Sequence, residues 1–266
     1  MGICRLCGAE GDLIDGHYMP AAIYKSIRRS SSIENMPSLI VADSSVGSAF
    51  TDKQVVQKLL CSVCEQRFSR EGERYVSGVW STKDDFALRS KVRGSKPYIS
   101  GGGESIYRVS DVLDVNHDAI FYFVLSVIWR GSFSGWKNHN HPALRVGRYR
   151  EEISRFLQGN KGRLKFSGVF AIIDESDKTR GLATFPVTSK NELGYAHVFR
   201  IPGVIFYVFL GEAATRFQAG FGLQGCSLPM VYLISPDFES IELESLSGVI
   251  KKRAKPRGRL ATFFSV

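Results

Sequence analysis

The stretches CRLCG at residues 4–8 and LCSVCE at residues 60–65 decide the fold of the N-terminal part of this chain. Each holds a C-x2-C pair, and a tight turn of this kind presents two thiolates to one ion while its backbone amides face the sulfurs. Two such turns complete a tetrahedral zinc site that has no open position. We therefore predict a structural Zn²⁺ bound by Cys4, Cys7, Cys61 and Cys64. The alternative interpretation is four free or redox-active cysteines.

Composition limits the class of protein. The chain has 266 residues, of which 44% are hydrophobic, and this is enough for one large domain or two smaller ones. Five cysteines, four of them in pairs, favour a metal site in a reducing compartment and leave Cys226 as an inert thiol. No basic-then-apolar signal segment follows Met1, and the longest apolar run, residues 119–129, is shorter than a bilayer span. We expect a soluble, cytoplasmic protein without a membrane partner.

The periodicity of apolar residues predicts an α+β fold in two parts. Residues 1–90 form a zinc-binding domain, and residues 105–266 form a helical plus β-sheet domain that ends in a basic arm. The Gly- and Pro-containing residues 90–105 mark the boundary. We also expect a Ser-rich loop at 30–50, a short helix from Asp52 through Gln57, and helices near 65–79, 119–132, 146–157 and 242–251. Asn116 or Asp118 should cap the helix at 119–132. A mostly antiparallel sheet is expected from strands near 164–173, 182–187, 196–201, 204–210 and 230–234, with a turn at Pro202-Gly203.

Basic residues indicate a polyanionic partner. The formal net charge is +9, and clustered Lys and Arg release counterions from a phosphate backbone. The candidate nucleic-acid-binding residues are Lys25, Arg28, Arg29, Arg67, Lys251, Lys252 and Arg253. The last three begin a tail of six cationic residues among nine, without an acid, at positions 251–259. Solvated helix faces and a solubilising tail are the alternatives.

A histidine lies between the two cysteine pairs. Residues 15–20 read DGHYMP, so His17 precedes Pro20 by three positions, and residues 60–69 read LCSVCEQRFS. This order of C-x2-C, H-x-x-P and L-C-x2-C resembles the zinc-containing HNH endonucleases, a treble-clef family with a ββα-metal motif. It is also similar to a group of bacterial proteins that carry both segments. The resemblance covers about residues 3–75 and implies an N-terminal treble clef, followed here by central helices and a C-terminal sheet.

The resemblance implies a role for three residues. His17 matches the general base that activates water, and an imidazole titrates near neutrality as that role requires. Glu65 stands where the family has an Asn or His ligand to a divalent ion, Mg²⁺ or Mn²⁺. Gly16 stands where the family has an acidic ligand, and Asp15 is the nearest carboxylate. Val55-Val56 stands where many members of the family carry an Asn-Leu pair, whose Asn orients the base. His17 is accordingly a catalytic base, a structural histidine or a relic.

These observations lead to one functional hypothesis and two alternatives. The hypothesis is a metal-dependent nuclease of the HNH type that hydrolyses phosphodiester bonds of nucleic acid, DNA in the first place, and the resemblance places such proteins in bacterial defence against phage or mobile DNA. The first alternative is a catalytically inactive zinc module that binds nucleic acid or protein. The second is that the C-terminal sheet is the functional part and binds a small ligand, a protein partner or a second copy of the chain.

Overall fold

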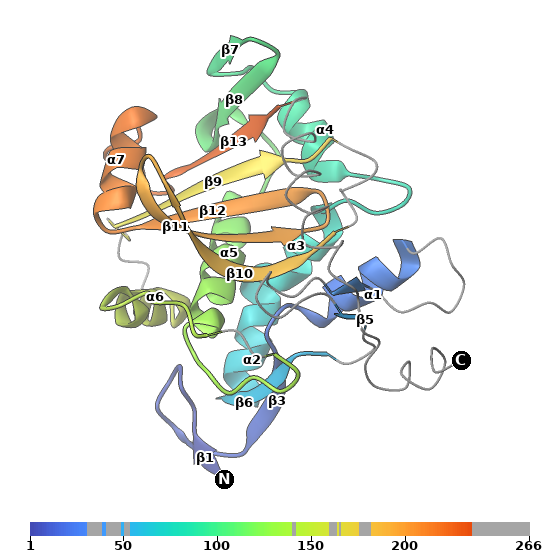
Figure 1. Ribbon diagram of the computed structural model, residues 1–266, viewed down its shortest axis with the longest axis vertical. Coiled ribbons are helices and arrows are strands. Elements are labelled where there is room, and N and C mark those ends of the chain that lie inside the picture. The colour runs from blue at the N-terminus through green and yellow to red at the C-terminus, as the bar shows by residue number, and fades with distance from the viewer. Residues whose placement is uncertain are drawn as a thin grey trace.

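The computed structural model describes residues 1–30, 39–40, 49–50, 54–139, 142–159, 164, 166–175 and 182–235. A seven-stranded sheet with the strand order β10-β11-β12-β9-β13-β8-β7 is its largest element (Figure 1). Neighbouring strands run antiparallel apart from the parallel pair β9–β13. The strands are β7 (Ile99–Gly101), β8 (Glu104–Arg108), β9 (Ser167–Ile173), β10 (Thr184–Asn191), β11 (Gly194–Ile201), β12 (Val204–Leu210) and β13 (Met230–Ile234).

The alternation of side chains in the strands places two layers on this sheet. Val204, Phe206 and Val208 of β12 belong to the main core, whereas Phe209 faces a smaller cluster around helix α7 (Glu212–Gly220). The predicted turn at Pro202-Gly203 joins β11 to β12 and is confirmed. Gly203 has φ +81°, a conformation that favours glycine.

Helix α5 (His117–Gly131) fills the main core. The Asn116 side chain accepts a hydrogen bond from the Ala119 amide at 3.0 Å, and this confirms one of the two predicted N-caps. Every residue from Ala119 to Gly131 is buried, as expected for a helix that is apolar on all sides. Phe123 contacts Phe199 and Phe206 of the sheet. The helix therefore lies between the sheet and the N-terminal part of the chain.

The N-terminal part consists of two short hairpins and a helical run. Strands β1 (Gly2–Ile3) and β2 (Glu10–Gly11) pair, as do β3 (Leu13–His17) and β6 (Val56–Cys61). The helical run continues through α2 (Ser62–Phe68), the π-helical turn η1 (Ser69–Glu73) and α3 (Arg74–Val79). The predicted helix through Gln57 is wrong, because Val56 and Gln57 pair with β3 as a strand.

The remaining elements complete the description. They are α1 (Ala21–Ser30), the two-residue strands β4 (Leu39–Ile40) and β5 (Ala49–Phe50), α4 (Ala87–Arg93), the 3-10 turn η2 (Val109–Asp111) and α6 (Tyr149–Leu157). Most of the predicted Ser-rich loop, and the last predicted helix near 242–251, lie outside the described residues. Among the described helices, none has the length and apolar character to cross a membrane.

One hydrophobic cluster connects the N-terminal part to the sheet. It contains Leu60 and Phe68 from the first 90 residues together with Phe123, Phe206 and Tyr232 from the rest of the chain. The arrangement brings the α2 helix and the end of α5 side by side, and these two elements surround the candidate site.

Candidate metal centre and its surroundings

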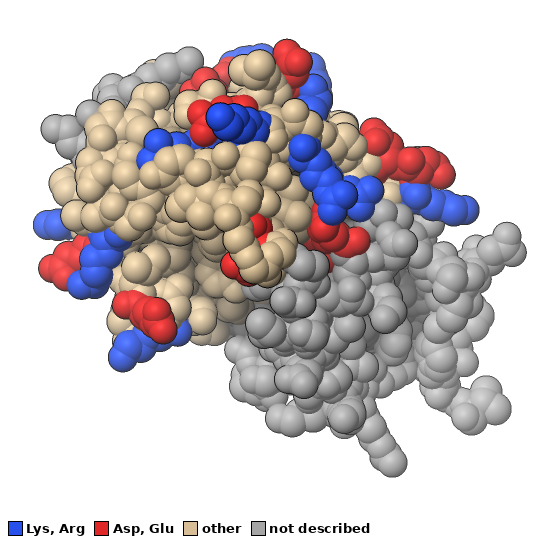
Figure 2. Space-filling model, turned by 90° about the horizontal axis from the view of Figure 1, so that it is seen from above, with Lys and Arg blue, Asp and Glu red and all other residues tan. Residues whose placement is uncertain are grey.

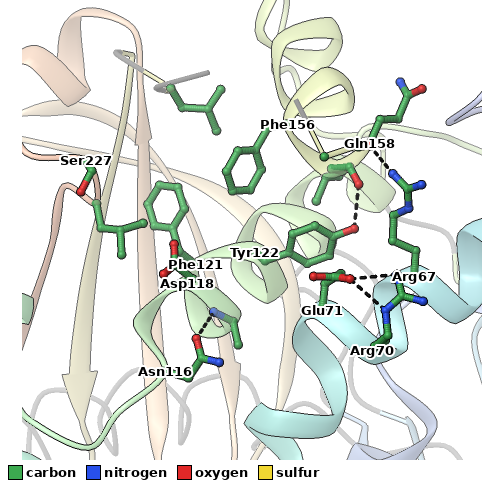
Figure 3. Close-up of a pocket in the computed structure, with 15 residues that line it drawn as sticks. Arg67, Arg70, Glu71, Asn116, Asp118, Phe121, Tyr122, Phe156, Gln158 and Ser227 are labelled. Atoms are coloured by element: carbon green, nitrogen blue, oxygen red, sulfur yellow. Dashed lines mark hydrogen bonds and ion pairs between the residues drawn. The ribbon is translucent and has the colours of Figure 1, made fainter. Parts of the chain in front are cut away.

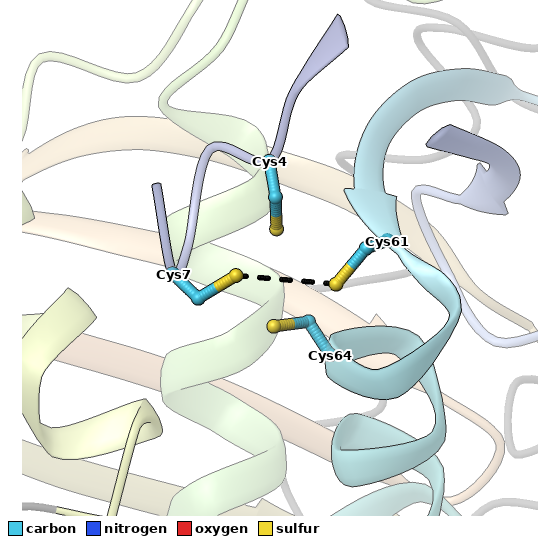
Figure 4. A group of neighbouring side chains, drawn as sticks. All are labelled: Cys4, Cys7, Cys61 and Cys64. Carbon is cyan, nitrogen blue, oxygen red and sulfur yellow. Dashed lines mark hydrogen bonds between the residues drawn. The ribbon is translucent and has the colours of Figure 1, made fainter. Parts of the chain in front are cut away.

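Four cysteine side chains converge between the first hairpin and α2. Their sulfur atoms all lie within 4.8 Å of one another, and Cys7 Sγ is 3.9 Å from Cys61 Sγ (Figure 4). Zn–S bonds of about 2.3 Å in a tetrahedron place sulfurs about 3.8 Å apart. The distances therefore match thiolates around one ion, and they are too long for a disulfide. The predicted ligand set forms a group that can hold a metal ion such as zinc.

The backbone explains why these cysteines meet. The Gly8 amide donates to the Cys4 carbonyl at 2.9 Å, and the turn closes at Gly8, whose φ is +76°. The Arg5 amide donates to the Leu59 carbonyl at 2.9 Å, which fixes the first turn against β6. Cys61 is the last residue of that strand. The second pair therefore faces the first one at the junction of β6 and α2.

The thiols have unequal acidity. Burial acts to raise the pKa of Cys4, but backbone amides of Cys7, Cys61 and Leu6 outweigh it and lower this pKa to about 7. Burial and the neighbouring sulfurs raise the pKa of Cys64. Four adjacent thiols cannot all ionise without a cation, because each thiolate repels the next. A bound divalent ion removes that repulsion, so the cluster has the chemistry of a closed, structural metal site.

His17 ends strand β3 and is half-buried. Its Nε2 is hydrogen-bonded to Oε1 of Gln54, and its ring centroid is 6.2 Å from that of Tyr24. An amide oxygen only accepts, so this contact assigns the hydrogen of the neutral imidazole to Nε2. The backbone of Gln54 is held by the Asn138 side chain, whose Nδ2 donates to the Gln54 backbone carbonyl at 3.0 Å. Sequence reasoning missed Gln54, because we looked for the orienting amide at Val56.

Glu65 lies directly beneath Gly16. A Cβ atom at Gly16 would lie 3.0 Å from Glu65 Oε2, so the missing side chain leaves room for this carboxylate. Oε2 is buried and has no hydrogen-bond partner among the described residues. Gln57 is the cross-strand partner of Gly16, and its Oε1 is likewise buried and unpartnered among them. Two oxygen ligands of the kind that Mg²⁺ prefers therefore share this face of the hairpin.

A buried arginine neutralises the same carboxylate. Arg130, 1% exposed near the end of α5, places Nη2 3.4 Å from Glu65 Oε1 and Nη1 2.7 Å from Glu73 Oε1. Its guanidinium lies 4.7 Å from the centre of the Phe68 ring. Burial acts to lower the pKa of Arg130, but Glu73 and Glu65 outweigh it and raise this pKa. The sequence could have indicated this ion pair, because Arg130 is a charged residue directly after the apolar run at 119–129, and a buried charge needs a partner.

Asp15 lies away from this group. Its carboxylate is half exposed and 3.7 Å from Lys137 Nζ. Neighbouring strand residues point to opposite faces, so Asp15 and His17 face away from the side on which Glu65 meets Gly16. The structure does not bring Asp15, His17 and Glu65 together as metal ligands: in the part of the chain that it describes, the four cysteines are the one such group.

Two of the seven predicted nucleic-acid-binding residues have side chains that the structure describes. Lys25 is exposed on α1, whereas Arg67 is half-buried and donates to the Gln158 carbonyl. The side chains of Arg28 and Arg29 lie outside the described residues, as do Lys251, Lys252 and Arg253. Figure 2 shows basic and acidic side chains interspersed on the described part of the face at the β7–β8 end. The described part of this face does not carry the basic stripe of a nucleic-acid interface.

Comparisons with known proteins add no family to this description. No family model matches the chain, and neither a curated protein nor a solved structure matches it.

Proposed function

We propose that the chain is a nuclease of the HNH type, which hydrolyses phosphodiester bonds of nucleic acid. In this proposal the four cysteines hold a zinc ion, and the β3–β6 hairpin with α2 forms a treble clef of the ββα-metal kind. The observation that carries it is the His17–Gln54 hydrogen bond, on a hairpin whose end is fixed to α2 by the cysteine cluster. This is the arrangement of a general base held by an orienting amide.

His17 has the geometry for proton transfer. Gln54 holds the Nε2–H tautomer, so Nδ1 accepts a proton from a water molecule as its oxygen attacks the phosphorus. The bond from phosphorus to the leaving sugar oxygen then breaks. His17 and the Glu65 carboxylate lie on opposite faces of β3, so the phosphate would lie across the end of this strand to contact both the base and a divalent ion held by Glu65. The ion, when bound, would stabilise the negative charge that develops on the phosphate and on the leaving oxygen.

Glu65 and Gln57, in place of the expected Asp15, are the residues that would hold a divalent ion. Their buried, unpartnered oxygens fit a hard cation. Arg130 weakens the attraction of this carboxylate for a cation, because its charge already faces the other oxygen of Glu65. We therefore propose weak binding of Mg²⁺ or Mn²⁺.

The test uses purified, zinc-loaded wild-type protein and the variants His17→Ala and Gln54→Ala. Supercoiled plasmid, single-stranded DNA and RNA are each incubated with Mg²⁺, Mn²⁺ or EDTA. We expect cleavage that requires the divalent ion and that falls about 10²–10⁴-fold in His17→Ala, the contribution of a general base. The loss in Gln54→Ala should be smaller, because the base remains and only its orientation is lost. His139→Ala is the matched control, since this histidine packs on Tyr18 and has no role in the proposal. Cleavage by His17→Ala at the wild-type rate would contradict the assignment.

The Arg130–Glu65 ion pair favours a second candidate function. A carboxylate that is already paired with an arginine binds a divalent ion weakly. Without that ion, the chain would be a zinc module that binds nucleic acid and does not cut it. In that case the same incubations give no product, while gel shifts detect a complex that weakens steeply with salt.

A further inference from the structure

A cavity lies on the far side of α2 from His17. Its volume is about 690 Å³, within the roughly 300–1,000 Å³ of small-molecule sites. Arg67 and Arg70 come from α2 and η1, Asp118 from the first turn of α5, and Phe156 from α6 (Figure 3). Residues 65 and 67 of a helix point about 200° apart, so Arg67 faces this cavity while Glu65 faces Gly16. The cavity is therefore separate from the proposed nuclease site.

Arg67 supplies an available positive charge. One of its N–H groups donates to the Gln158 carbonyl, which is neutral, and no carboxylate of the described residues is within ion-pair distance. Arg70, by contrast, is paired with Glu71 at 2.9 Å. A guanidinium has five N–H donors in a planar fork that suits phosphate oxygens. Arg67 therefore has donors left for an anionic group inside the cavity.

Asp118 supplies an acceptor on another wall. Figure 3 shows it at the start of α5, away from Arg67. Asp118 is exposed, and among the described residues its carboxylate has no hydrogen-bond or ion-pair partner. A carboxylate with two free oxygens pairs best with two parallel N–H donors.

An aromatic surface connects the two walls. The half-buried Phe156 ring packs edge to face on Phe121, with 5.9 Å between centroids and 83° between planes. Tyr122 is held by a 2.8 Å hydrogen bond from its hydroxyl to the Leu157 carbonyl. Phe121 and Tyr122 are buried, so Phe156, fixed by its packing on Phe121, is the ring that offers a flat ligand a surface on which to stack.

We propose that this cavity binds a guanine nucleotide. The phosphate contacts Arg67, the N–H groups at positions 1 and 2 of guanine donate to Asp118, and the ring lies against Phe156. Guanine is the base that offers two adjacent N–H donors to one carboxylate, whereas adenine offers its single amino group. The proposal does not depend on the proposed nuclease activity.

Isothermal titration of the full-length, zinc-loaded protein with GMP tests the proposal. We expect one GMP per chain, with guanosine and AMP each at least about tenfold weaker, because each lacks one charge-assisted contact. Arg67→Ala then binds GMP and guanosine alike, and Asp118→Asn binds GMP and AMP alike. Arg74→Ala, an exposed arginine farther along the same helical run, is the matched control and binds GMP as the wild type does.

Four results would overturn the proposal: no heat with millimolar GMP, guanosine as tight as GMP, AMP as tight as GMP, or inorganic phosphate as tight as GMP. Circular dichroism establishes that each variant is folded. If Arg67→Ala does not fold, the comparison of GMP, guanosine, AMP and phosphate on the wild-type protein still decides.

Discussion

At the scale of single residues, the buried guanidinium of Arg130 joins two carboxylates of the neighbouring helical run. Glu65 and Glu73 lie one on each side of Phe68, whose ring the guanidinium covers. Burying three charges is costly, and the cost is offset when each has a partner. The ion pairs therefore tie the end of α5 to α2 and η1, and they fix where the Glu65 carboxylate lies.

Removing the guanidinium tests this interpretation. We expect Arg130→Met to lower the free energy of unfolding by about 3–5 kcal/mol, because it leaves two carboxylates facing each other in a buried site. Urea denaturation measures the change. Arg74→Met, on the exposed face of α3, should change it by less than about 0.5 kcal/mol. Equal stability of Arg130→Met and the wild type would show that the ion pairs contribute nothing.

His197 gives a pH dependence at the same scale. It is buried in β11, where Nδ1 lies 3.1 Å from Thr188 Oγ1, and burial lowers its pKa to about 4. The unfolded chain takes up this proton near pH 6.5 and the folded chain does not. Stability therefore falls as the pH drops from about 6.5 towards 4, by about 2–3 kcal/mol at pH 4.5.

Comparison with His197→Gln isolates this contribution. Urea unfolding of both proteins between pH 7.5 and 4.5 measures it, since proton uptake by all other groups cancels in the difference. The free energy of unfolding of the wild type, relative to that of His197→Gln, should fall by about 2–3 kcal/mol as the pH drops over this range. Stability curves that stay parallel would mean that the folded protein accepts the proton at its ordinary pKa.

At the scale of elements, the sequence predicts those that depend on neighbouring residues better than those that depend on distant contacts. The cysteine turns and strands such as β13 could be predicted, because spacing and alternation within a few residues determine them. The β7–β8 hairpin was missed: its glycines were interpreted as a linker, and β8 depends on pairing with β13 more than 120 residues away. Gln54 was missed for the same reason, since it meets His17 across 37 residues.

The crossing of η1 and α5 depends on one glycine. A Cβ atom at Gly72 would lie 2.9 Å from the backbone nitrogen of Phe123, closer than side chains normally approach. We expect Gly72→Ala to cost about 2–3 kcal/mol, because the two helices must separate. Gly78, in α3, is the matched control: it is exposed and has no atom within 4 Å of such a Cβ.

Gly78→Ala should be neutral or stabilise the protein by up to about 1 kcal/mol, since alanine restricts the unfolded chain and favours the helix. Chemical denaturation of both variants gives the two values. If both alanines had the same effect, close packing at Gly72 would not be the reason for the glycine.

At the scale of the whole molecule, the hydrophobic core runs through both predicted parts. The residues predicted as a boundary, 90–105, include β7, which belongs to the large sheet. Leu60, beside Cys61 of the cysteine cluster, lies in the same hydrophobic cluster as Tyr232 of β13. Side chains that share one core lose their contacts together, so the cysteine cluster and the sheet should unfold in one transition.

Metal removal tests this coupling. We expect the protein to contain one zinc ion. Removing it with a chelator, or by Cys64→Ser, should lower Tm by about 10 °C or more. The free energy of unfolding then falls by several kcal/mol, and each kcal/mol shifts the Tm of a chain of this size by about 2–4 °C. Tryptophan fluorescence, which reports on Trp80, Trp129 and Trp136 together, and far-UV circular dichroism should move together. Cys226→Ser, at an exposed thiol outside the cluster, should keep both the zinc and the wild-type Tm. A chelator-sensitive transition that separates from an unchanged main one would instead mean that the N-terminal part folds on its own, and that its metal serves only the hairpin carrying His17.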